Sequence, residues 1–135
     1  MALIVPDLGE QELLDKAIKD ALSVDEGYSL RLYKAVSPAL GESTVTANFT
    51  VADFTGYANV ALTRSGAAAA QTSAGTTFTT WAQQEWTNTG ASQTVLGYYV
   101  VAATSGVTLW AEAFAVARTL ETGDKLQLTP RLELG

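Results

Sequence analysis

The stretch from residue 94 to residue 103 reads Thr-Val-Leu-Gly-Tyr-Tyr-Val-Val-Ala-Ala and is nearly all apolar. An apolar run of this length, bounded by turn residues, is typical of a central strand that is buried on both faces. The short turn Thr104-Ser105-Gly106 follows it, and Val107–Ala115 then returns as a second apolar strand. The sequence therefore predicts a β-hairpin at the centre of a sheet, with Thr94–Ala103 as its buried strand.

Further strands are predicted on both sides of this hairpin, because apolar and polar residues alternate there. In the first of them, Leu30 and Leu32 fall on the apolar face and Tyr33 on the polar face. Pro130 lies inside the last one and lacks an N–H, so that strand either forms an edge or bends there. The expected strands are Tyr28–Tyr33, Val45–Val51, Tyr57–Leu62, Phe78–Thr87 (turning at Asn88-Thr89-Gly90) and Lys125–Leu134.

About seven or eight short strands separated by turn signals predict a mainly β fold, a jelly-roll-like β-sandwich of two sheets. One helix precedes the strands. Asp7 and Glu10 form a capping-box pattern, and apolar residues at helical spacing continue to Leu22, so we expect an N-terminal α-helix over about residues 8–23. Residues 1–135 contain no repeat or linker and are expected to form one domain, with the β region over about 28–134.

Two segments are candidates for intermolecular contact. The helix carries an apolar stripe, so it either lies across its own domain or docks as an arm on another subunit. Arg64–Gly75 is rich in small residues and is expected to be an exposed loop, with at most one helical turn at Ala67–Gln71. That loop is either a flexible connection or a partner contact. The candidate interface residues are Leu13, Leu14, Ile18, Leu22, Ala67, Ala69 and Trp81.

Composition narrows the classes of function. The chain of 135 residues has no His and no Cys, which excludes the usual zinc sites, Cys nucleophiles, His-assisted Ser nucleophiles and disulfide scaffolds. Its 14 acidic and 8 basic residues give a formal charge of −6, which argues against nucleic acid binding. No signal peptide or membrane-spanning stretch is recognisable. No glycine-rich phosphate loop or paired Asp motif occurs either, so no cofactor and no metal are expected.

Glu85 and Glu112 are the carboxylates with notably apolar neighbours in the sequence. Two such groups could cleave glycosidic bonds, one as an acid with a raised pKa and the other as a base or nucleophile. The simpler expectation is that each is paired or faces solvent. Glu112 shares a strand face with Trp110, so an inward orientation would require a partner such as Arg31 or Arg118.

The three tryptophans suggest either sugar binding or core packing, because exposed aromatic rows can stack on sugar rings. Trp81 and Trp86 are five positions apart, so in a regular strand they point to opposite faces and do not form one flat platform. We therefore expect core positions for Trp86 and Trp110, and a strand-edge or interface position for Trp81.

Several packing and turn motifs occur in order along nearly the whole chain. They are Val5-Pro6-Asp7-Leu8-Gly9-Glu10, Leu30-Arg31-Leu32-Tyr33, Phe54-Thr55-Gly56-Tyr57, Gln93–Val100, Leu109–Phe114 and Gly123-Asp124-Lys125-Leu126. With these motifs the chain resembles a family of small structural proteins of tailed bacteriophages and is similar to capsid decoration, or cement, proteins. The resemblance implies a jelly-roll-like domain that sits on the outside of a capsid shell and ties major capsid subunits together.

The resulting hypothesis is a non-enzymatic capsid decoration protein, made in the host cytoplasm and located on the outer capsid surface of the virion. Its expected partners are the major capsid protein and further copies of itself, as a dimer or a trimer, with no nucleic acid and no membrane. Such a protein needs preformed contact surfaces and no active site. One alternative is a tail or other virion module that binds host-surface glycans through exposed aromatics. Another is a glycoside-cleaving enzyme that uses Glu85 and Glu112.

Overall fold

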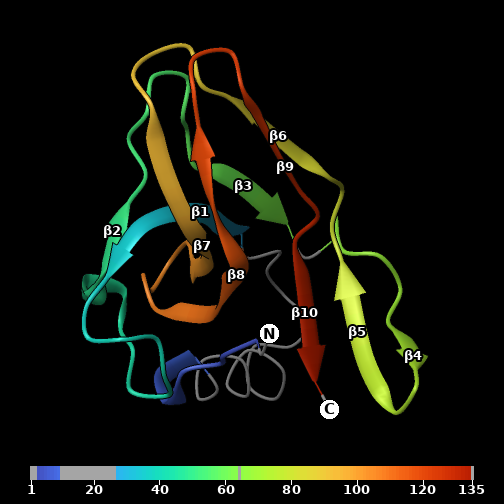
Figure 1. The fold of residues 1–135 in the computed structure, drawn as a ribbon. Helices are drawn as coiled ribbons and strands as arrows, with labels where there is room; N and C mark the ends of the chain where they lie inside the picture. Colours follow the sequence, from blue (N-terminus) through green and yellow to red (C-terminus); the bar gives the residue numbers. More distant parts are fainter. Residues whose placement is uncertain (1–2, 10–26, 64, 135) are drawn as a thin grey trace.

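The structure is a computed structural model and describes residues 3–9, 27–63 and 65–134. These residues form ten strands and one short 3₁₀ helix, and all strand pairs among them are antiparallel (Figure 1). The prediction of a mainly β fold is confirmed. The elements are β1 Gly27–Val36, η1 Thr46–Asn48, β2 Phe49–Val51, β3 Val60–Thr63, β4 Gln71–Ser73, β5 Thr76–Thr80, β6 Gln84–Thr87, β7 Gln93–Ala102, β8 Thr108–Leu120, β9 Lys125–Leu128 and β10 Arg131–Leu134.

The largest sheet is built around the predicted hairpin, now β7 and β8. Its strand order is β2-β1-β7-β8, and β3 also pairs with the first part of β1. β7 lies between β1 and β8, so both of its edges are hydrogen-bonded, and Gly97 to Ala102 are buried. An apolar strand with two paired edges belongs in the middle of a sheet, and the predicted central strand is confirmed.

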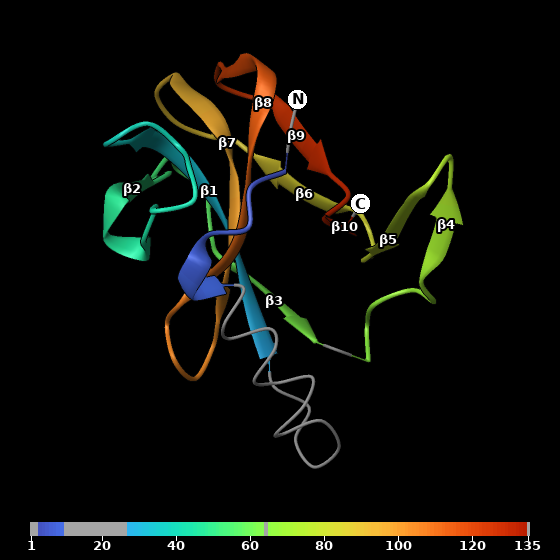
Figure 2. The ribbon, with the colours of Figure 1, turned by 90° about the horizontal axis from the view of Figure 1, so that it is seen from below.

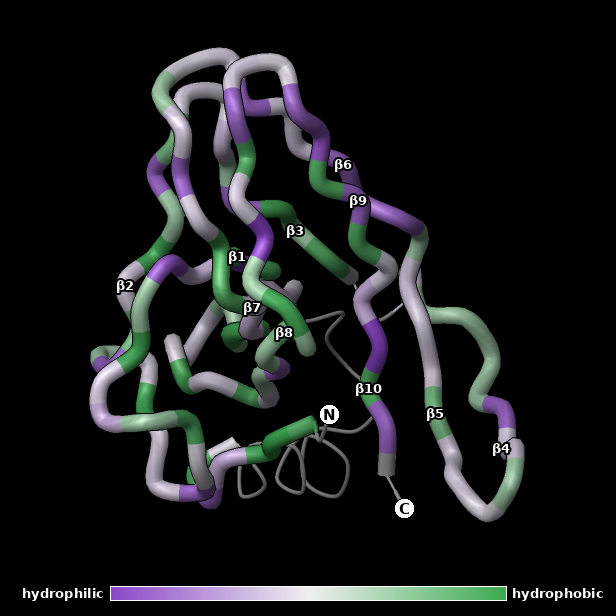
Figure 3. The backbone as a smooth tube through the Cα atoms, viewed as in Figure 1, coloured by the Kyte–Doolittle hydropathy of each residue, from purple (hydrophilic) through white to green (hydrophobic). Residues whose placement is uncertain are grey.

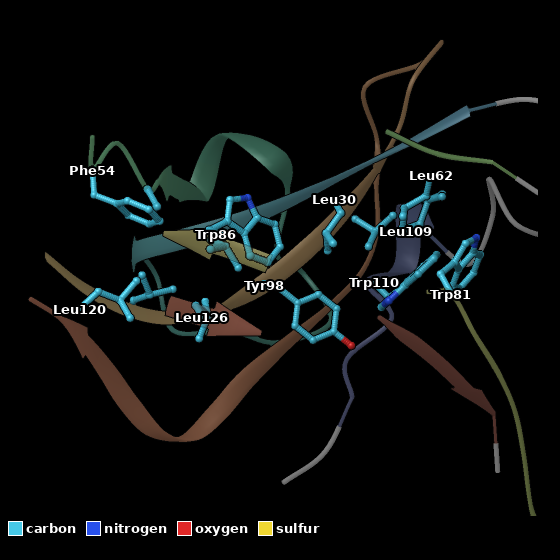
Figure 4. Packing of buried hydrophobic residues seen from close by; sticks show 14 of the residues in the cluster. Leu30, Phe54, Leu62, Trp81, Trp86, Tyr98, Leu109, Trp110, Leu120 and Leu126 are labelled. Carbon is cyan, nitrogen blue, oxygen red and sulfur yellow. The ribbon is translucent and has the colours of Figure 1, made fainter. Parts of the chain in front are cut away.

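Side chains on the two faces of this sheet enter two different apolar clusters. Leu32 and Val100 belong to the main core on one face, together with Leu30 and Tyr98 (Figure 4). On the other face Tyr33 packs with Phe49 and Tyr99, at ring-centroid distances of 5.1 and 6.2 Å. The sequence pattern assigned Tyr33 to a polar face, and this is wrong: the ring is 1% exposed because the second cluster covers it.

A second layer covers the main-core face of the large sheet. It consists of the two-stranded sheet β6–β9 and the three-stranded sheet β10-β5-β4 (Figure 2). Trp86 from β6 and Leu126 from β9 are buried in the main core, and Leu132 from β10 packs against it. Within this layer, β4 and β5 form a hairpin that extends away from the large sheet and from the β6–β9 sheet in both views (Figures 1 and 2).

Two stretches predicted as single strands are each divided between the smaller sheets. Phe78–Thr87 becomes β5 and β6, with Trp81 in the break, and Lys125–Leu134 becomes β9 and β10, with Pro130 in the break. The two breaks face each other, because the Trp81 backbone N–H donates to the Pro130 carbonyl oxygen at 3.0 Å. Pro130 has no N–H with which to continue a ladder. The bend that its position predicts is confirmed, whereas the undivided strand Phe78–Thr87 is wrong.

The predicted strand Val45–Val51 is also wrong over most of its length. Its middle forms η1, and only Phe49–Val51 pairs with β1. Local side-chain bonds explain the difference. The Thr44 hydroxyl accepts from the Gly41 N–H at 2.8 Å, and the Asn48 side-chain oxygen accepts from the Val45 N–H at 2.7 Å. Such bonds offer the backbone an alternative to a strand ladder.

β8 is longer and less regular than predicted. It continues to Leu120, beyond the expected end at Ala115. Near its middle, residues 114–117 stand opposite Leu96 of β7 alone, so the register shifts. We call residues 114–117 the β8 bulge. A bulge bends a strand and re-aims its side chains, and here it leaves Val116 71% exposed.

The N-terminal segment supports the sheet edge before the predicted helix begins. Ile4 and Ala111 of β8 form an isolated bridge with two backbone hydrogen bonds of 2.9 and 2.8 Å. Asp7 to Gly9 are helical, in agreement with the expected start. The rest of the predicted helix over about 8–23 lies outside the described residues.

The predicted exposed loop Arg64–Gly75 is described from residue 65 onward. Its residues are exposed except for the half-buried Ala67, as expected. It contains no helical turn over 67–71 and instead enters β4 at Gln71. The tip of the β4–β5 hairpin has positive φ at Ala74 and Gly75, 50° and 81°, a backbone that a tight two-residue turn requires.

Candidate functional site

Glu85 lies on β6 and is held by side chains of the paired strand β9. Its two carboxylate oxygens accept from Lys125 Nζ at 2.9 Å and from Gln127 Nε2 at 2.7 Å. The hydrogen bond from Lys125, followed by that from Gln127, lowers the pKa of Glu85. A general acid in glycoside hydrolysis needs the opposite shift, because it must hold a proton near neutral pH. The expectation that Glu85 is paired or faces solvent is confirmed, because the side chain is both paired and exposed.

Glu112 lies on β8, in a different sheet from Glu85, and its partner is a tyrosine. Its Oε2 accepts from the Tyr98 hydroxyl at 2.9 Å, and the same hydroxyl is 3.2 Å from the Arg131 carbonyl oxygen. The two residues are directly opposite in the β7–β8 register. Glu112 is therefore paired, as expected, but its partner is Tyr98 and not Arg31 or Arg118. Burial, and then the negative charge of Glu112, raise the pKa of Tyr98.

Trp81 occupies a core position. Its indole stacks on Trp110 with ring centroids 5.6 Å apart, and its Nε1–H donates to the Thr63 carbonyl at 2.8 Å. The side chain is 7% exposed and lies between β5 and β6, so the predicted strand-edge position is wrong, while a contact with a partner stays a prediction. The core positions of Trp86 and Trp110 are confirmed. Strand alternation failed for Trp81 because it lies in the break between two strands.

The other aromatic residues are also engaged inside the fold. All aromatic residues of the chain lie in its described part, and each of them is buried or half-buried. Sugar-binding surfaces of the stacking type need exposed ring faces. The described residues therefore present no aromatic platform, which weighs against the glycan-binding alternative.

The predicted interface residues are distributed over three environments. Leu13, Leu14, Ile18 and Leu22 lie outside the described residues. Ala67 is half-buried and packs against the main core, and Ala69 is exposed just before β4. Trp81 is buried. A contact role for any of them stays a prediction.

The β4–β5 hairpin projects from the rest of the described chain, and part of it is exposed. We call residues 68–80 the hairpin arm. Ala68 to Gly75 are exposed, and the sequence from 65 to 84 contains no charged residue. Figure 3 shows the arm as mostly pale or green, with one purple stretch at β4. The Thr72 and Thr77 hydroxyls, 3.0 Å apart, join the two strands across one face. The arm is thus an ordered, uncharged projection.

Two concave surfaces formed by described residues are open grooves. One groove of about 340 Å³ lies between the end of β8 and β9, where Arg118, Asp124 and Lys125 line it. Another of about 230 Å³ lies between Leu8, η1 and the β7–β8 turn. Neither is lined by Glu85 or Glu112. No cluster of three acidic side chains suited to a metal ion occurs in the described ranges.

Comparison with known proteins assigns no family: no protein-family model matches the chain, and no curated protein sequence matches it. Over the residues that the structure describes, no helix has the length and apolar character needed to cross a membrane. The resemblance to phage structural proteins therefore stays a prediction.

Sequence reasoning missed two surface features. The outer edge of β4 lies within a stretch expected to be a loop, and the β8 bulge lies at the predicted end of a strand. The signal for the first was the absence of charge from residue 65 to residue 84 in an exposed segment. The bulge had no clear signal, because the inserted residues continue the apolar composition of the strand.

Proposed function

We propose that this chain is a non-catalytic decoration protein of a tailed-phage capsid, a jelly-roll-like β domain that binds the outer shell and stabilises contacts between major capsid subunits. The observation that carries the proposal is the hairpin arm. A hairpin that projects from its domain, contains no charged residue and exposes residues 68–75 is poorly suited to a protein that works alone in water. It is suited to one that works inside an assembly.

The polar and aromatic groups of the described chain support an adhesive role. Glu85 and Glu112 each have partners within the fold, and every aromatic residue is buried or half-buried. A protein that binds the assembled shell but not its free subunits adds its binding energy to the stability of the shell. Individual contacts can be weak, since several copies on a regular lattice bind with a high effective concentration.

The acidity of the chain fits an outer position. A formal charge of −6 would be repelled by packaged DNA, so the inner surface of a filled head is a poor location. A tail module that binds host glycans has less support, because its exposed aromatics are missing from the described surface.

The test uses phage heads that lack this protein, prepared from the phage that encodes it. Purified protein is added back, and binding is followed by cosedimentation and particle imaging. We expect saturable binding at a fixed number of copies per head and a higher temperature of DNA release. Heads that already carry the protein are the control and should gain neither. Absence of binding, or binding that leaves heat resistance unchanged, would contradict the proposal.

A parallel measurement separates the alternatives. Wild-type protein and Glu112→Gln are assayed on polysaccharides and on a glycan array. We expect no turnover and no glycan retention by either. Turnover that is lost in Glu112→Gln would establish the glycosidase, and specific glycan retention would establish the tail module.

A further inference from the structure

We draw no further inference here: the strongest candidate, the groove of about 230 Å³ between Leu8, η1 and the β7–β8 turn, exposes the apolar side chains of Leu8 and Val45, and nothing in the structure shows what covers it.

Discussion

The indole of Trp81 stacks on the indole of Trp110, with ring centroids 5.6 Å apart and planes inclined by 24°. Trp110 belongs to β8 in the large sheet, whereas Trp81 lies in the break between β5 and β6 in the second layer. The ring of Trp81 also meets Tyr28 of β1 edge-on at 6.2 Å. One side chain outside any strand thus connects the two layers where the smaller sheets divide (Figure 4).

Replacing this side chain should be costly. Trp81→Ala removes a buried ring and leaves a cavity, which typically lowers the free energy of unfolding by about 3–5 kcal/mol. Trp81→Phe retains part of the packing but loses the hydrogen-bond donor to the Thr63 carbonyl oxygen. Its free energy of unfolding should therefore fall by less than that of Trp81→Ala. Urea unfolding followed by circular dichroism measures both. A Trp81→Ala protein as stable as wild type would show that the ring is not part of the core.

Gly97 of β7 is a position where a methyl group does not fit. A Cβ there would collide with the Glu112 carbonyl oxygen and lie 2.7 Å from the Tyr33 hydroxyl oxygen. Both neighbouring strands are hydrogen-bonded to β7, so the backbone cannot move away. We expect Gly97→Ala to destabilise the fold by about 3 kcal/mol or more. Thermal and urea unfolding of the purified variant would measure this.

The matched control for that substitution is Gly75→Ala at the tip of the hairpin arm. A Cβ at Gly75 meets nothing within 4 Å, although its φ of +81° disfavours an L side chain. The expected cost is about 1–2 kcal/mol. If the control proved as damaging as Gly97→Ala, crowding at the centre of the sheet would not be the cause.

Asn88 joins two loops from inside the protein. Its side chain is fully buried, donates to the carbonyl oxygens of Ala91 and Leu120 at 2.9 and 2.8 Å, and accepts from the Gly90 N–H at 2.9 Å. Asn88→Ala leaves these buried groups without partners, so we expect a loss of about 1–3 kcal/mol. Asn88→Asp should also be destabilised, because a carboxylate cannot donate.

Thermal unfolding measures these losses, with Thr89→Ala as the control at the exposed neighbouring position. The control should unfold close to wild type. Equal stability of Asn88→Ala and Thr89→Ala would mean that solvent replaces the hydrogen bonds of Asn88 without cost.

Stability should decline in alkali because of Tyr57. Its hydroxyl accepts from the Leu32 N–H at 3.0 Å and donates to Asn59 at 2.7 Å, and burial raises the pKa of Tyr57 to about 12. An unfolded tyrosine ionises near 10. The contribution of Tyr57 to the free energy of unfolding is therefore intact below about pH 10 and is lost as the pH rises toward about 12. The free energy of unfolding should fall by less than about 1.4 kcal/mol per pH unit, because Tyr57 is only partly buried.

The measurement follows phenolate absorbance and circular dichroism together during an alkaline titration. Burial also raises the pKa values of Tyr33 and Tyr98, so we expect these phenolates to appear together with loss of structure. In Tyr57→Phe the decline between pH 10 and 12 should be shallower. Full ionisation of all five tyrosines near pH 10 in a protein that stays folded would contradict this.

Local features of the chain were predictable because their causes are local. The apolar run in β7, the turn after it and the bend at Pro130 each follow from residues within one segment. For Tyr33, alternation correctly placed the side chain on the face opposite Leu32. It could not show that this face would be covered, because Phe49 and Tyr99, which cover it, come from other strands.

The candidate surfaces were only partly predictable for the same reason. The small residues around Ala69 are visible in the sequence, and they correctly indicated an exposed segment. Whether that segment is a loose loop or an ordered edge depends on β5, which itself pairs with β10 more than fifty residues away. The burial of Trp81 depends on the break opposite Pro130, which no local periodicity encodes.

The sequence by itself determined that this is a mainly β chain with a buried central hairpin, since side-chain period and turn residues act over a few positions. Only the tertiary structure decided which strands divide, which face of each strand is covered, and where β8 inserts the residues that expose Val116. The division of strands depends on pairing of β6 with β9 and of β5 with β10, the covered face of Tyr33 depends on β2 and β7, and the inserted residues depend on the register between β7 and β8. Long-range strand pairing depends on how well side chains from distant parts of the sequence pack together. Alternation of apolar and polar residues within one strand does not indicate which other strand it pairs with.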